Sequence, residues 1–165
     1  MDELNTIVNN KSLFVNPSSD PKSDFNSVLI LEGLTNTADA FGYAIKEHLP
    51  NVLAIVCNNP QKCLGLIPEM YFDCLVCDMD NPELEGAKVI HEFQSRLSPT
   101  TVSIACTADI RNEDLWKDQC SPDYVYTKPD KLNSQELQDF ASIIKTGISI
   151  AHQNRIEAWG YDPDK

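Results

Sequence analysis

Five short apolar runs recur along this chain, and consecutive runs are separated by enough residues to form a helix. The runs are SVLIL (27–31), NVLAIV (51–56), DCLVC (73–77), TVSIAC (101–106) and DYVYT (123–127). Strands of a parallel sheet are buried on both faces, so they are apolar without alternation. Segments with helical spacing of apolar residues lie between them, at 36–48, 60–67, 84–97 and 109–119. We therefore predict an α/β fold, a doubly wound five-stranded parallel sheet with helices on both faces.

The 165 residues are expected to form one compact domain with extensions at both ends. Residues 1–25 are rich in Asn, Ser, Asp and Pro and show no period, so they are predicted to be an N-terminal extension. Residues 26–147 contain the apolar runs and form the predicted domain. A long helix is expected from about 134 to 157, with Asn133 as its cap.

Residues 148–165 are predicted to continue this last helix and to end in a tail. The helix is longer than a small sheet needs for cover, since each residue adds about 1.5 Å. Its apolar positions continue past the sheet, at Ile148, Ile150, Ala151 and Ile156. We expect this extension to support a homodimer or to bind a partner protein.

Charge and composition exclude several classes of protein. There are 25 acidic and 13 basic residues, for a net charge of -12, so direct binding to nucleic acid is not expected. No apolar run approaches the ~18 residues of a membrane-spanning helix, and no secretion signal is evident. The six cysteines need no pairing in a core of this size. We expect a reduced, cytoplasmic protein whose partners are proteins or small ions.

Polar residues follow four of the five runs, where a parallel α/β sheet places its ligand site. They are Glu32, Asp78, Thr107 and Lys128. A carboxylate, a hydroxyl and an ammonium at one sheet edge suit acceptance of a phosphoryl group on Asp78, with Thr107 and Lys128 holding its oxygens. Such a site needs a divalent cation to offset negative charge, and Mg²⁺ is expected on Asp78 and neighbouring oxygens.

The segment around Asp78 adds a family resemblance. Pro82 and Gly86 stand four and eight positions after Asp78, Thr107 is followed by Ala108, and Lys128 is followed by Pro129. Over about residues 26–145 the chain resembles the receiver domain of two-component response regulators. The resemblance implies that Asp78 accepts a phosphoryl group from a histidine kinase or a phosphorelay protein. It also implies that Thr107 binds the phosphoryl group, that Lys128 reports its presence, and that a downstream target protein is contacted.

Two positions depart from the family pattern. Receivers carry two adjacent acids after the first strand, whereas here Glu32 is followed by Gly33. The metal ligands implied are therefore Glu32, Asp78 and Asp80, with Mg²⁺ weakly held. The aromatic switch residue of the family falls on Val125, and the flanking Tyr124 and Tyr126 are both candidates for its role.

Two other functions remain open. Gly33 favours a degenerate receiver that acts as an interaction module without phosphate. Asp78-Met79-Asp80 also resembles the first motif of haloacid-dehalogenase-type phosphatases, in which the second Asp is the general acid and base. That family carries the motif on its first strand, whereas here it follows the third run, so we do not expect an enzyme. The chain is expected to be a single-domain regulator or the N-terminal domain of a longer one.

Overall fold

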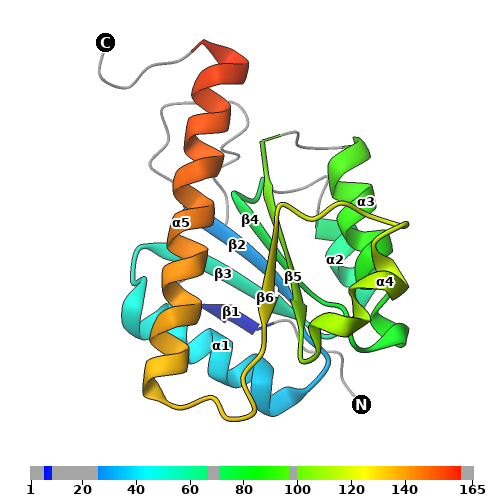
Figure 1. Cartoon of the computed structure of the whole chain (residues 1–165). Coiled ribbons are helices and arrows are strands. Elements are labelled where there is room, and N and C mark those ends of the chain that lie inside the picture. Colours follow the sequence, from blue (N-terminus) through cyan, green and yellow to red (C-terminus); the bar gives the residue numbers. More distant parts are fainter. Residues whose placement is uncertain (1–5, 9–25, 67–70, 97–99, 161–165) are drawn as a thin grey trace.

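The computed structural model describes residues 6–8, 26–66, 71–96 and 100–160 (Figure 1). Its strands are β1 (Thr6–Val8), β2 (Asn26–Leu31), β3 (Val52–Cys57), β4 (Cys74–Asp78), β5 (Val102–Thr107) and β6 (Tyr124–Thr127). Its helices are α1 (Thr35–His48), α2 (Pro60–Leu66), α3 (Gly86–Arg96), α4 (Glu113–Trp116) and α5 (Ser134–Trp159). Two 3-10 turns, η2 (Pro82–Leu84) and η3 (Ile110–Asn112), precede α3 and α4.

The strands form one sheet in the order β1-β3-β2-β4-β5-β6. The five strands from β2 to β6 are parallel, as the apolar runs predict. The chain moves from β2 to β3 on one side and then crosses to β4 on the other side of β2. The carboxyl ends of β2, β4, β5 and β6 therefore lie side by side at one edge of the sheet.

The structure corrects the sequence prediction at two places. Residues 6–8, inside the predicted N-terminal extension, form β1 and pair antiparallel with β3, so the sheet has six strands. A strand of three residues is too short to show a period, which is why the sequence pattern missed it. The helix predicted at 109–119 is shorter, because the 3-10 turn η3 takes up its first residues and α4 spans Glu113–Trp116.

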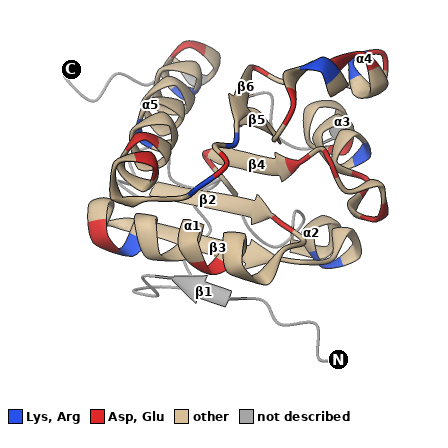
Figure 2. Cartoon of the chain, turned by 60° about the horizontal axis from the view of Figure 1, so that its bottom comes forward, with Lys and Arg blue, Asp and Glu red and all other residues tan. Residues whose placement is uncertain are grey.

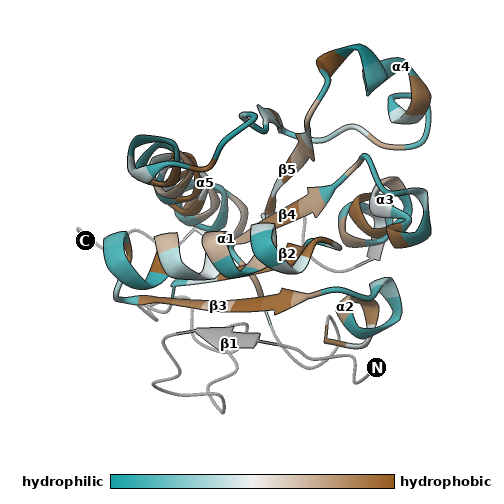
Figure 3. Cartoon of the chain, turned by 90° about the horizontal axis from the view of Figure 1, so that it is seen from below, coloured by the Kyte–Doolittle hydropathy of each residue, from teal (hydrophilic) through white to brown (hydrophobic). Residues whose placement is uncertain are grey.

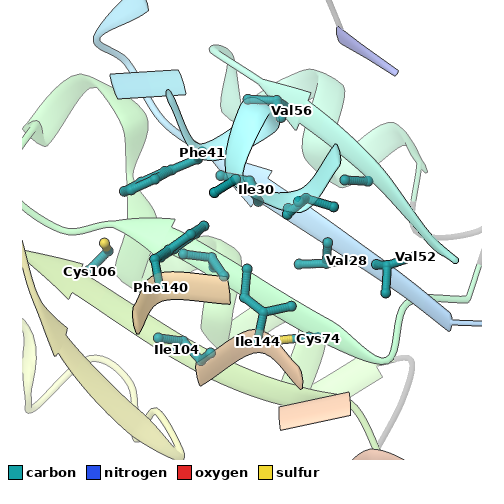
Figure 4. Close-up of a cluster of buried hydrophobic side chains, with 14 of the residues drawn as sticks. Val28, Ile30, Phe41, Val52, Val56, Cys74, Ile104, Cys106, Phe140 and Ile144 are labelled. Carbon is teal, nitrogen blue, oxygen red and sulfur yellow. The ribbon is translucent and has the colours of Figure 1, made fainter. Parts of the chain in front are cut away.

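Two apolar cores cover the two faces of the sheet (Figure 3). One core lies under α1 and α5, where the rings of Phe41 and Phe140 stack with centroids 3.9 Å apart (Figure 4). The other lies under α2, α3 and α4 and includes Phe93 and Trp116. The central strands contribute to both cores by alternation, so they are buried throughout and hold the strand ends in fixed positions.

Helix α5 begins with the predicted cap, since Asn133 Oδ1 accepts the Glu136 N–H at 3.0 Å. Beyond residue 148 one side of the helix is covered by the rest of the chain, because Ala151 and Arg155 are buried while Gln153 and Glu157 are exposed. The Arg155 guanidinium forms an ion pair with the fully buried Asp73, just before β4, and lies over the ring of Tyr71. Ile150 and Ile156 are half-buried. The prediction that Ile148 and Ala151 extend past the cover of the chain is wrong, because both are buried. Self-association through α5 stays a prediction.

Among the described residues, no helix has both the length and the apolar character needed to cross a membrane.

Candidate functional site

Four polar side chains meet at the carboxyl edge of the sheet. Glu32 follows β2, Asp78 ends β4, Thr107 ends β5 and Lys128 follows β6. In Figure 2 the acidic segments at the ends of β2 and β4 are red, and the arrows of these two paired strands point to the same edge of the sheet. The residues predicted from the strand ends are thus brought to one place.

The Lys128 ammonium lies between two buried carboxylates. Its Nζ is 2.9 Å from Glu32 Oε2 and 3.1 Å from Asp78 Oδ1. The Glu32 and Asp78 side chains are only 1% and 3% exposed. Glu32 Oε1 accepts the Leu34 N–H at 3.0 Å, while Oε2 meets the Lys128 ammonium in an ion pair. The Lys128 ammonium is thus the counter-ion of both carboxylates, and their burial leaves little water to screen these charges.

Burial and charge act in opposite directions on these groups. Burial raises the pKa of Glu32, and the contacts with Lys128 and the Leu34 N–H reverse only part of that effect. Burial alone would lower the pKa of Lys128, but its contact with Glu32 outweighs burial, and its pKa is raised to about 12. Lys128 therefore remains a cation at neutral pH and can stabilise negative charge that develops on Asp78.

Thr107 contacts the loop after β4 through Asp80. The Thr107 hydroxyl donates to Asp80 Oδ1 at 2.5 Å, and the Ala108 N–H donates to Asp80 Oδ2 at 2.6 Å. The Asp80 N–H in turn donates to Asp78 Oδ1 at 2.9 Å. Asp80 thus connects the Asp78 carboxylate to the two donors at the end of β5.

Two glycines shape the loops around the site. A Cβ on Gly86 would lie 2.5 Å from the backbone oxygen of Asp78, so only glycine lets α3 begin this close to β4. Gly33 has no left-handed φ, but a Cβ there would lie 2.8 Å from Asn81 Nδ2 and 3.1 Å from Leu84 Cδ1. A side chain at position 33, where a receiver carries its second acid, would therefore require the Asn81 amide and the Leu84 side chain to shift.

The predicted Mg²⁺ ligands do not fit a common ion in this arrangement. Glu32 uses both oxygens within the chain, and Asp80 directs both of its oxygens to Thr107 and Ala108. In the part of the chain that the structure describes, no group of three His, Cys, Asp or Glu side chains is placed to hold a metal. The chemistry that this arrangement itself offers is therefore that of Asp78, Lys128 and Thr107.

The two candidate switch tyrosines differ in burial. Tyr126 is 7% exposed, and its ring packs against Phe140 at 5.5 Å. Burial raises its pKa to about 12, and its hydroxyl has no hydrogen-bond partner among the described residues. Tyr124 is 44% exposed and Val125 is 37% exposed. Which tyrosine acts as a switch stays a prediction.

Sequence reasoning missed the contacts of Asp80. It placed Asp80 among the metal ligands, and the structure directs the Asp80 side chain to Thr107, 27 positions away. It also missed the backbone N–H of Ala108, since an amide has no signature in the sequence. A parallel sheet brings the residues that follow β4 and β5 together, and this signal was available from the predicted strand order.

No family model matches this sequence, and the comparison with curated proteins finds no relative. Solved structures do match. The phosphorylated cyanobacterial phytochrome response regulator RcpA is 14% identical, with a TM-score of 0.64 over 76% of this chain and 95% of that one. The receiver domain of a sensor histidine kinase from Pseudomonas aeruginosa PAO1, with a magnesium ion coordinated in its active site cleft, is 16% identical, with a TM-score of 0.62 over 76% of this chain and 98% of that one.

A CheY-like response regulator receiver domain protein from Methanospirillum hungatei JF-1 is also similar. It is 18% identical, with a TM-score of 0.62 over 79% of this chain and 98% of that one. These identities are low, so the likeness rests on the arrangement of the strands and helices. Together with the five parallel strands of the described residues, it shows that the chain has the CheY-like receiver fold, with the long C-terminal helix α5.

Proposed function

We propose that this chain is a signalling receiver that accepts a phosphoryl group on Asp78 from a histidine kinase or a histidine phosphotransfer protein. The observation that supports it most is the Lys128 ammonium 3.1 Å from Asp78 Oδ1, with the Thr107 hydroxyl at the end of the adjacent strand. An acceptor carboxylate, a fixed cation and a hydroxyl donor are among the groups that promote phosphoryl transfer.

In the proposed step, a carboxylate oxygen of Asp78 attacks the phosphorus of a phosphohistidine. The new bond is P–O, the P–N bond breaks, and its electron pair leaves with the imidazole nitrogen. The product is an acyl phosphate on Asp78. Lys128 is already held at this carboxylate, so it stabilises the charge on the transferred group without reorganisation.

The output of the proposed receiver is contact with a downstream target protein. The excess of acidic residues argues against a nucleic-acid target. In this role the chain keeps the phosphoryl group on Asp78, and turnover of a free substrate is not expected. The phosphatase alternative requires hydrolysis of a phosphate ester by Asp78 and Asp80, and turnover of a generic ester would support that alternative instead.

A second candidate is an interaction module that works without phosphate. Two observations favour it, namely Gly33 in place of the second acid and the contact of Asp80 with Thr107 and Ala108. In that case the ion pair of Lys128 with Glu32 and Asp78 is structural, and partner binding does not depend on a phosphoryl group.

Intact mass spectrometry separates the two candidates. The chain is incubated with acetyl phosphate and excess MgCl₂, beside the variant Asp78→Asn. The receiver proposal predicts a mass increase of one phosphoryl group in the wild type and none in Asp78→Asn. No adduct on the wild type, or an equal adduct on Asp78→Asn, overturns the assignment of Asp78 as the acceptor.

A further inference from the structure

The Asp80 side chain binds two donors at the end of β5. Its Oδ1 accepts from the Thr107 hydroxyl at 2.5 Å and its Oδ2 accepts from the Ala108 N–H at 2.6 Å. Both bonds are short. Thr107 is fully buried, whereas Asp80 is exposed. The donors are thus fixed by the fold, and the carboxylate reaches them from the protein surface.

These donors form an anion site beside Asp78. They face a group with two oxygens and a negative charge, which a phosphoryl group on Asp78 would also present. The Asp80 backbone N–H donates to Asp78 Oδ1 at 2.9 Å, so the bound carboxylate belongs to a residue that already contacts the acceptor. A phosphoryl group on Asp78 can therefore bind Thr107 and Ala108 only where the Asp80 carboxylate now lies.

We propose that the Asp80 carboxylate occupies the Thr107–Ala108 anion site while Asp78 is unmodified, and that a phosphoryl group on Asp78 displaces it. This inference rests on the proposed function. It assigns Asp80 a regulatory role as an internal competitor for the phosphoryl group. Charge favours the exchange once transfer has occurred, because the phosphoryl group and Asp80 are both negative and repel each other.

The structure provides space for the displaced side chain. A cleft of about 590 Å³ borders Asp80 and lies between the loop after β4 and α4, with Asn81, Glu85 and Trp116 among its lining residues. Rotation of Asp80 toward this cleft requires no movement of β4 or β5. The phosphate-dependent change is therefore expected in the loop of Asp80 and Asn81, with Thr107 bound to an anion in both states.

The first test measures the contact without phosphorylation. Hydrogen exchange at the Ala108 amide is followed by NMR in the wild type, Asp80→Ala and the control Asp114→Ala. Asp114 is 89% exposed and pairs with Lys117 at 3.7 Å, so its removal deletes one exposed carboxylate of α4. Exchange at Ala108 should accelerate in Asp80→Ala alone. Equal exchange in all three proteins would overturn the inference, whatever the outcome of phosphorylation.

The second test measures the rate of phosphorylation by acetyl phosphate with MgCl₂. If Asp80 is bound to Thr107 and Ala108 about ten times more often than it is turned away, these donors are free about a tenth of the time. Asp80→Ala should therefore be phosphorylated about tenfold faster or more. Asp80→Asn keeps the shape but loses the charge, and an intermediate rate is expected. It serves as the second variant if Asp80→Ala folds poorly.

The two proposals fail in different ways. If the wild type is phosphorylated as fast as Asp80→Ala and Asp80→Asn, the Asp80 inference is wrong and the receiver function stands. If none of the three proteins is phosphorylated, the proposed function is wrong and the inference falls with it. Faster reaction of Asp114→Ala to the same degree would show a general charge effect and would also overturn the role of Asp80.

Discussion

Replacing Lys128 with methionine removes the ammonium that lies between two buried carboxylates. Glu32 and Asp78 would then face each other with side chains 1% and 3% exposed. Loss of one partner from a buried ion pair typically costs about 3–5 kcal/mol, because the remaining charge is left without compensation. We expect a loss of this size in the free energy of unfolding at neutral pH.

Urea denaturation at pH 7 measures this loss. In a chain of this size about 1 kcal/mol corresponds to a shift of about 2–4 °C in Tm, so Lys128→Met should also melt about 6–20 °C lower. Lys88→Met is the matched control, because Lys88 lies 3.8 Å from Glu85 with both side chains about half exposed. Its loss should stay within about 1 kcal/mol.

The pH dependence follows from the raised pKa of Glu32. Glu32 binds a proton more tightly in the folded chain than in the unfolded chain. Its contribution to the free energy of unfolding is therefore fully present below its unfolded pKa of 4.5, and it is lost as the pH rises through its folded pKa. Lys128→Met removes a contact that lowers this pKa, so its stability should fall more steeply with pH than that of the wild type. The deficit should therefore be smaller near pH 4.5 than at pH 7.

The variant Lys128→Met/Glu32→Gln provides the rescue. A neutral amide at position 32 would leave Asp78 as the remaining buried carboxylate of the pair, so most of the lost stability should return. The reasoning is refuted if Lys128→Met loses no more stability than Lys88→Met, or if the double variant is less stable than Lys128→Met.

Three further predictions concern the surroundings of the site. Gly86→Ala places a Cβ 2.5 Å from the Asp78 carbonyl oxygen and should destabilise the chain by about 1–3 kcal/mol in urea denaturation. Arg155→Met leaves the fully buried Asp73 without its main cation, so the chain should lose about 3–5 kcal/mol, with a smaller loss at acid pH because burial raises the pKa of Asp73. Gly33→Asp adds a carboxylate beside Glu32 and should tighten Mg²⁺ binding measured by titration calorimetry.

Each of these predictions has a result that contradicts it. An unchanged urea midpoint for Gly86→Ala would show that α3 can shift at no cost. Equal stability of Arg155→Met and wild type would mean that the C-terminal turns of α5 are held by other contacts. If Gly33→Asp binds Mg²⁺ no better than the wild type, Asn81 and Leu84 keep the new side chain away from the metal.

The strand ends of the site could be predicted because parallel strands bring their carboxyl ends together. The apolar runs place Glu32, Asp78, Thr107 and Lys128 after neighbouring strands, and the structure brings them to one edge. This inference needs only the strand order, so it does not depend on any side-chain conformation.

The contacts of Asp80 and Arg155 could not be predicted from the sequence, because they depend on the direction in which each side chain points. The Asp80 side chain is exposed, and its direction is set by two donors at the end of another strand, the Thr107 hydroxyl and the Ala108 N–H. Arg155 pairs with Asp73 across 82 positions. The signal was partial, since Arg155 stands four residues after the buried Ala151 on the covered side of α5.

The central claim is that Asp78 carries the phosphoryl group, and locating the modified residue tests it most directly. The chain is treated with acetyl phosphate and MgCl₂, then with sodium borohydride, which reduces an acyl phosphate to the alcohol, and the peptides are sequenced by mass spectrometry. We predict homoserine at position 78, and none there without acetyl phosphate or after Asp78→Asn. Homoserine at position 80 or at another acidic residue, with Asp78 intact, would contradict the account.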